Sequence, residues 1–150
     1  MIDVINLQRK VKLDLAPIRA FVANLTRSVD EVEIKTFSVA FVSDNRMKQL
    51  NSMFRGKDAT TDVLSFPREP DEFTSNLPTA DGQLPTVFLG DIVISAEQAQ
   101  KQAAENDLSL ENEIKQLILH GLLHLCGYDH ETDNGEMNRR ELELREKLGI

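Results

Sequence analysis

The chain has 150 residues, of which 41% are hydrophobic, and a formal net charge of −8. That length and composition suit one globular domain over residues 1–150, and no apolar run approaches the roughly 20 residues of a membrane span. The N-terminus lacks a basic segment followed by an apolar stretch, so we expect no secretory signal. A single cysteine, Cys126, cannot form an internal disulfide, which fits a cytoplasmic location.

The predicted secondary structure alternates between strands and helices in the first half of the chain and is helical in the second. Helices are predicted where apolar residues recur every three or four positions, and strands where they alternate with polar ones. In chain order we predict a strand over 2–7, a helix over 16–27, a strand over 33–42, a helix over 43–54, strands over 61–66 and 87–94, and helices over 95–105, 109–126 and 133–148. This order predicts an α+β domain, with a small mixed sheet of about four strands covered by about five helices.

Local details refine this prediction. The alternation in the strand over 33–42 breaks once, which predicts a β-bulge. Ser95 with Gln98 three residues later predicts a capping box. Along the helix over 43–54 the apolar residues Met47, Leu50 and Met53–Phe54 fall on one side. Residues 68–86 hold three of the five prolines and are predicted to be a long loop, a kind of segment that is often functional.

The charge is unevenly distributed along the chain. Residues 1–60 carry ten Lys/Arg and seven Asp/Glu, whereas residues 61–150 carry seven and eighteen. Four of the basic residues lie within twelve positions, namely Arg46, Lys48, Arg55 and Lys57. The net charge argues against a nucleic-acid partner, but phosphate binding also responds to the local potential. On charge alone, a solvated helix face is the simpler interpretation of these residues.

All three histidines of the chain fall within eleven residues, in the pattern H-x-x-x-H-x-x-G-x-x-H. His120 and His124 are four residues apart, so on a helix they share one face with Cβ atoms about 6 Å apart. Gly127 can adopt the left-handed conformation that ends a helix, and the chain can then bring His130 back. Three protein ligands with an open fourth position are typical of a catalytic zinc site. We therefore predict one Zn²⁺ per chain on these histidines.

The residues between the histidines limit the chemistry. The spacing matches that of metzincin peptidases, but Gly121 stands where those enzymes carry their general-base glutamate. This argues against a peptidase of that mechanism. A helical glycine costs about 1 kcal/mol relative to alanine, so we expect either close approach of a backbone or substrate, or tight packing of helix against strand. Cys126 lies two residues from His124 and is expected to point away from the ligand face.

Two further segments carry candidate functional residues. Residues 51–67 place Arg55, Lys57 and several hydroxyl groups between a helix and a strand. A guanidinium group can bind phosphate oxygens through two hydrogen bonds, although a well-capped turn with a charge pair is an equal alternative. Residues 88–94 contain Asp91, which needs a partner if the strand is buried. It could orient a ligand histidine or pair with an arginine.

Three motifs together resemble the YbeY family of bacterial rRNA maturation factors, which are metal-dependent single-strand endoribonucleases. They are N-x-x-F-R-x-K-D-x-x-T-D-V-L-S-F-P, L-G-D-I-x-I-S and H-G-x-L-H-L-x-G-Y-D-H, and the resemblance covers roughly residues 30–135. It implies an α+β sandwich and zinc ligands at His120, His124 and His130. It also implies a catalytic role for Arg55, and Lys57 is a candidate for binding the substrate phosphate.

The resemblance further implies action on single-stranded ribosomal RNA in 3′-end maturation of the small subunit and in ribosome quality control. The expected partners are the small subunit and its assembly proteins, with no DNA or membrane. The general base stays open among Asp62, Asp91 and Asp129, and the 2′-hydroxyl of the RNA could itself be the nucleophile. Two other classes also stay open: a non-catalytic, zinc-stabilised assembly factor, and a zinc hydrolase of another substrate.

Overall fold

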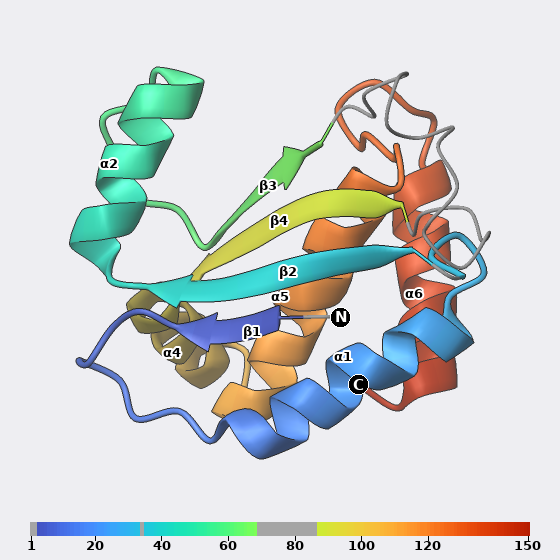
Figure 1. Ribbon diagram of the computed structural model, residues 1–150, viewed down its shortest axis with the longest axis horizontal. Coiled ribbons are helices and arrows are strands. Elements are labelled where there is room, and N and C mark those ends of the chain that lie inside the picture. The colour runs from blue at the N-terminus through green and yellow to red at the C-terminus, as the bar shows by residue number, and fades with distance from the viewer. Residues whose placement is uncertain (1–2, 34, 69–86) are drawn as a thin grey trace, which may run out of the picture.

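The computed structural model describes residues 3–33, 35–68 and 87–150. Within these ranges there are four strands and five helices, in the order predicted (Figure 1). They are β1 (Asp3–Asn6), α1 (Leu15–Ser28), β2 (Thr36–Val42), α2 (Asp44–Arg55), β3 (Val63–Pro67), β4 (Phe88–Ser95), α4 (Ala96–Glu105), α5 (Leu110–Leu125) and α6 (Glu136–Leu148). The predicted loop over 68–86 lies almost wholly outside the described residues. None of the helices in the described ranges combines the length and apolar character that crossing a bilayer requires.

The sheet is mixed, as predicted, with strand order β1-β2-β4-β3. β1, β2 and β4 run parallel, whereas β3 pairs antiparallel with β4 and forms one edge. The pairing of β2 with β4 shifts register between Thr36 and Ser38, which confirms the predicted irregularity in this strand. The edge position of β3 leaves one side of its backbone free for contacts with side chains from elsewhere.

The main core lies between one face of the sheet and helices α1, α5 and α6 (Figure 1). α5 begins at its N-cap Ser109, as predicted, and has nine buried residues along its length. Alternate positions of β4, Ile92 and Ile94, are completely buried on this face. α5 is therefore held on several sides, which makes it a rigid support for the histidines near its C-terminus.

α2 packs on the opposite face of the sheet and covers only part of it. Met47 is fully buried there in a small cluster with Val93 and Leu64. The last turn of α2 is different, because Met53 is 67% and Phe54 is 58% exposed. The apolar side predicted for this helix is therefore buried only over its first two turns. The ring of Phe54 meets that of Phe66 edge-on at 5.2 Å.

Two local predictions also require correction. Ser95 caps α4 by accepting from the backbone amide of Gln98, but the return half of the capping box is absent. The Gln98 side chain donates to Asp44 instead, and the Ser95 amide donates to the Asp62 carbonyl. α6 begins three residues later than predicted, with Gly135 at its N-cap. The Asp133 carboxylate lies in the turn before it and accepts from the amides of Gly135 and Met137.

Gly121 lies where α5 comes closest to the sheet. A Cβ atom there would be 2.9 Å from Ile92 Cγ2 and 3.2 Å from Ser65 Oγ. The same Ser65 hydroxyl donates to the Gly121 carbonyl at 3.0 Å. Of the two explanations offered by the sequence, close helix–strand packing is the one that the structure supports.

We expect Gly121→Ala to destabilise the fold by about 1–3 kcal/mol, because overpacking outweighs the gain in helix propensity. Urea unfolding of the two proteins measures this difference. Ile92→Ala should cost less in the Gly121→Ala background than alone, since it removes the atoms that clash. Wild-type stability of Gly121→Ala would contradict the packing explanation.

Candidate functional site

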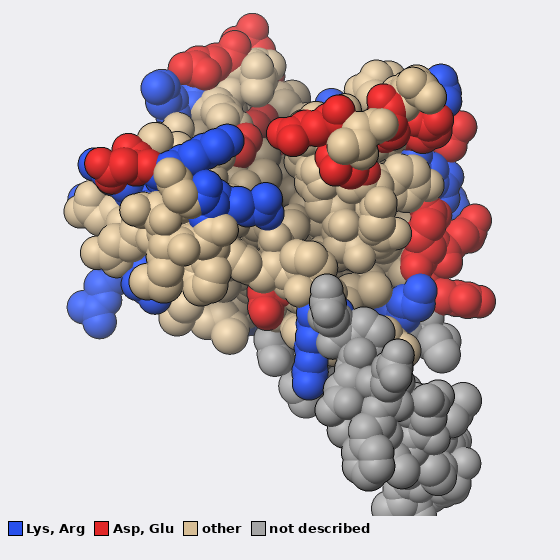
Figure 2. Space-filling model, turned by 90° about the horizontal axis from the view of Figure 1, so that it is seen from above, with Lys and Arg blue, Asp and Glu red and all other residues tan. Residues whose placement is uncertain are grey.

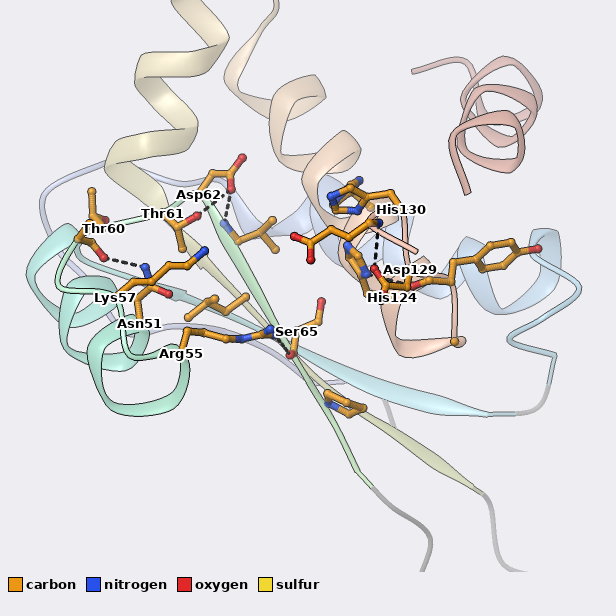
Figure 3. Close-up of a pocket in the computed structure, with 18 residues that line it drawn as sticks. Asn51, Arg55, Lys57, Thr60, Thr61, Asp62, Ser65, His124, Asp129 and His130 are labelled. Atoms are coloured by element: carbon orange, nitrogen blue, oxygen red, sulfur yellow. Dashed lines mark hydrogen bonds between the residues drawn. The ribbon is translucent and has the colours of Figure 1, made fainter. Parts of the chain in front are cut away.

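The three histidines come together at the C-terminal end of α5. His120 and His124 lie on the last two turns of the helix, and His130 follows in the loop before α6 (Figure 3). Their ring centroids are 4.9, 5.5 and 5.1 Å apart in the three pairs. One possible ligand atom from each lies within 4.8 Å of the other two, so the cluster could hold one metal ion.

Hydrogen bonds in the loop after α5 turn the chain back toward the helix. The amides of Gly127 and Tyr128 donate to the carbonyls of His124 and Leu123 at 3.0 and 3.1 Å. Gly127 has a φ of +100°, a conformation that side-chain-bearing residues rarely adopt. This turn reverses the chain within a few residues and brings His130 beside the helix, as the spacing predicted.

Both helical histidines are oriented through Nδ1. His120 Nδ1 lies 3.0 Å from the Glu141 carboxylate, and His124 Nδ1 lies 3.1 Å from the Tyr128 carbonyl. Because both partners are acceptors, each Nδ1 carries a proton, which leaves Nε2 as the ring atom available to bind a metal ion. The donor set therefore fits a metal ion bound through two Nε2 atoms and the His130 ring.

The surroundings of His124 and Glu141 shift the pKa values of both groups downward. Burial and the neighbouring His120 lower the pKa of His124, which favours the neutral imidazole that metals bind. Burial raises the pKa of Glu141, but the His120 hydrogen bond and nearby positive charge outweigh it, so the net shift is downward. Cys126 lies outside the cluster, and burial raises the pKa of its thiol to about 11. It therefore stays protonated, and thiols bind metals as thiolates.

The histidines open into a cleft whose other wall is formed by the end of α2, the following loop and β3 (Figure 3). Arg55 and Lys57 are exposed on this wall, and Arg55 Nη2 donates to the Ser65 carbonyl at the free edge of β3, at 3.2 Å. Asp129 and Glu131 lie on the histidine side. Figure 2 shows the same division, with basic side chains on the α2 side of a hollow and acidic ones across it.

Internal hydrogen bonds fix the loop between α2 and β3. Asn51, which is buried, donates from Nδ2 to the Ala59 carbonyl at 2.8 Å. The Asp44 carboxylate accepts from Thr60, Ser95 and Gln98. The loop is therefore tied to the starts of both α2 and α4. Arg55 and Lys57 are thus held near the cleft by partly buried polar contacts.

The prediction for Asp91 is wrong. Its side chain is exposed and accepts from the Ser38 hydroxyl, and within the described ranges it forms no hydrogen bond or ion pair with a histidine or an arginine. It lies on the sheet face opposite the one on which Ile92 and Ile94 are buried. Asp91 also does not line the cleft, whereas Asp62 and Asp129 do.

Sequence analysis missed the partners that orient the histidines. Glu141 lies 21 residues beyond His120, and nothing in its spacing indicates the contact. Tyr128 falls inside the histidine motif, but its role here is through its main-chain carbonyl, which every residue has. Glu31, which accepts from the Tyr128 hydroxyl, and Arg140, which donates to Glu31, come from two further segments.

Comparison with known proteins agrees with this architecture. The family model described as Endoribonuclease YbeY matches residues 3–149. A Nautilia profundicola protein named Endoribonuclease YbeY is 47% identical over 116 residues, which cover 77% of this chain and 74% of the relative. A Pelotomaculum thermopropionicum protein of the same name is 40% identical over 156 residues, covering 98% and 96%. The solution structure of TM1509 from Thermotoga maritima matches with a TM-score of 0.63 at 27% identity, covering 99% of this chain and 89% of that one.

The family match spans almost the whole chain, and it includes the turn and histidine motif that build the cluster. The two relatives match 77% and 98% of this chain at 47% and 40% identity. The chain belongs to the YbeY family.

Proposed function

We propose that this protein is a zinc-dependent endoribonuclease that cleaves single-stranded ribosomal RNA. Its biological role is 3′-end maturation of small-subunit rRNA and ribosome quality control in the cytoplasm. The observation that carries the proposal is the cleft in which three histidines face Arg55 and Lys57. The names of the relatives, Endoribonuclease YbeY, support the reaction class.

His120, His124 and His130 are the proposed metal ligands, and one ion is held per chain. Neutral imidazoles suit zinc, and three protein ligands leave a coordination position open for chemistry. A bound zinc ion supplies Lewis acidity and an activated water near neutral pH. Glu141 and the Tyr128 carbonyl keep two of the imidazoles oriented for this task.

Arg55 is the proposed catalytic residue on the opposite wall. Its guanidinium group is permanently charged and can hold two phosphoryl oxygens, on which negative charge builds in the transition state. Its hydrogen bond to the Ser65 carbonyl uses one N–H and leaves others for the substrate. Lys57, which is exposed on the same wall, is the proposed contact for an RNA phosphate.

Two nucleophiles are compatible with the cleft: a water molecule activated by a general base, and the 2′-hydroxyl of the RNA. Asp62 and Asp129 line the cleft and are the candidate general bases. The Asp62 carboxylate accepts from the Val63 amide, and that of Asp129 accepts from the Glu131 amide, so both are fixed in place. Alternatively, the RNA supplies its own 2′-hydroxyl as nucleophile. A peptidase mechanism of the metzincin type has no support, because Gly121 stands at the position of its general base and cannot act as a base.

The proposed partners follow from the substrate. A cleft with one basic wall can admit an unpaired RNA backbone, whereas an A-form helix presents a rigid, wide surface. We therefore propose the small ribosomal subunit and its assembly proteins as partners, with neither DNA nor a membrane among them.

The test is cleavage of an end-labelled rRNA-precursor fragment by protein of measured zinc content. We expect the single strand to be cut at least about tenfold faster than the same sequence in a duplex, with cleavage lost on chelation and restored by Zn²⁺. Equal cutting of the duplex would contradict single-strand preference. Folded, zinc-loaded protein that binds the RNA without cutting it would favour the non-catalytic assembly factor.

A further inference from the structure

The carbonyl that orients His124 belongs to Tyr128, so the position of this peptide decides how the histidine points. The carbonyl lies 3.1 Å from His124 Nδ1, and the amide of Tyr128 donates to the Leu123 carbonyl at 3.1 Å. Neither contact involves the phenol. The Tyr128 side chain packs, partly buried, against the main core.

The Tyr128 hydroxyl has a partner far away in the sequence. It donates to Glu31 Oε2 at 3.0 Å, across 97 residues. Glu31 lies in the turn between α1 and β2, which Figure 1 shows beside α6. The loop that carries Tyr128 and His130 is therefore tied, through one hydroxyl, to a segment outside the cleft.

Arg140 of α6 fixes Glu31 in turn. Its Nε and Nη2 donate to the two carboxylate oxygens of Glu31 at 2.9 and 2.7 Å, and each side chain is only 23% exposed. This is the two-point geometry that makes guanidinium–carboxylate pairs specific. The Arg140 hydrogen bonds also hold the pKa of Glu31 at about 2, so the carboxylate stays an acceptor for Tyr128.

We propose that Arg140, Glu31 and Tyr128 form a positioning chain that holds the Tyr128 peptide against His124 and slows release of the metal ion. The inference rests on metal binding by the three histidines, but not on cleavage of RNA. Glu141, the neighbour of Arg140, contacts His120 directly. α6 thus supports both helical histidines, one through a carboxylate and the other through this chain.

The hydrogen bonds of the positioning chain could instead simply join α6 to the end of α1. A second contact between the same elements distinguishes the two explanations. Lys147 Nζ donates to the Ser28 carbonyl at 2.7 Å. It joins α6 to the end of α1 without touching the histidine loop. Lys147→Met is therefore a matched control, because it weakens the same junction and leaves Tyr128 and Glu31 in place.

The experiment measures zinc release from loaded protein into excess chromogenic chelator, without RNA. We expect Tyr128→Phe and Glu31→Gln to release zinc about 3–10-fold faster than wild type, at or below the low end of the effect of a direct orienting partner. The double variant should release zinc no faster than the faster single variant, since both substitutions break the same positioning chain. Lys147→Met should release at the wild-type rate.

Urea unfolding of the metal-free proteins verifies that each variant is folded. Wild-type release rates in folded Tyr128→Phe and Glu31→Gln would overturn the proposal, and so would equal acceleration by Lys147→Met. Because no RNA is present, a failure here is distinct from a failure of the proposed ribonuclease activity. Protein with normal zinc release that cuts no RNA would keep the positioning chain and remove the proposed function.

Discussion

Replacing His130 by alanine is expected to lower zinc affinity by at least about 100-fold, because losing a ligand exceeds the 10–100-fold effect of losing an orienting partner. Cleavage of single-stranded RNA should fall with it. His130 is exposed, unlike the two helical histidines, so its removal leaves little packing to lose. The stability of the metal-free protein should change by no more than about 0.5 kcal/mol. Zinc titration, urea unfolding and RNA cleavage on the same preparations measure these three quantities.

The control for this experiment comes from the same loop. Thr132 is exposed two residues beyond His130 and does not line the cleft, so Thr132→Ala should keep wild-type affinity and cleavage. A His130→Ala protein that binds zinc normally would remove this residue from the ligand set. If it loses zinc and still cleaves RNA, the metal is not part of the reaction, and the activity needs another centre.

The histidine cluster was predictable because its geometry is local. A spacing of four residues on a helix and one turn at a glycine determine the relative positions of His120, His124 and His130. The structure brings the three together as expected. Most elements were predictable for the same reason, since caps such as Ser109 and the apolar periodicity act within a few residues. The use of the three histidines as metal ligands remains a prediction.

The sequence predictions failed where the burial of a residue depends on which face of its strand or helix another element covers. Asp91 alternates with Ile92, so it points away from α5, and only the extent of α2 decides whether that face is buried. The exposure of Phe54 could not be predicted either, because burial of the last turn of α2 depends on which other elements pack on it. Glu141 and Glu31 were missed for a related reason, since contacts across 21 and 97 residues follow from tertiary packing and not from spacing.

Arg55→Ala is expected to reduce the rate of RNA cleavage by about 100–1,000-fold, the usual cost of removing one group that stabilises transition-state charge. The substitution should leave zinc content unchanged, because Arg55 lies on the wall opposite the histidines. Its fold should also survive, since the side chain is exposed and, within the described ranges, makes one hydrogen bond, to the Ser65 carbonyl. Arg55→Lys should recover only part of the rate, because lysine keeps the charge but loses the two-point fork.

Arg46→Ala is the matched control for Arg55→Ala, because Arg46 is exposed on the same helix, carries the same charge and does not line the cleft. If general electrostatic attraction of RNA explained the role of Arg55, both variants would weaken binding alike, and the loss would diminish as salt rises. If Arg55 acts on the reacting phosphate, its loss lowers kcat at saturating RNA, and Arg46→Ala does not. Equal cleavage by wild type and zinc-loaded Arg55→Ala would place the chemistry elsewhere and make the assembly-factor role the leading one.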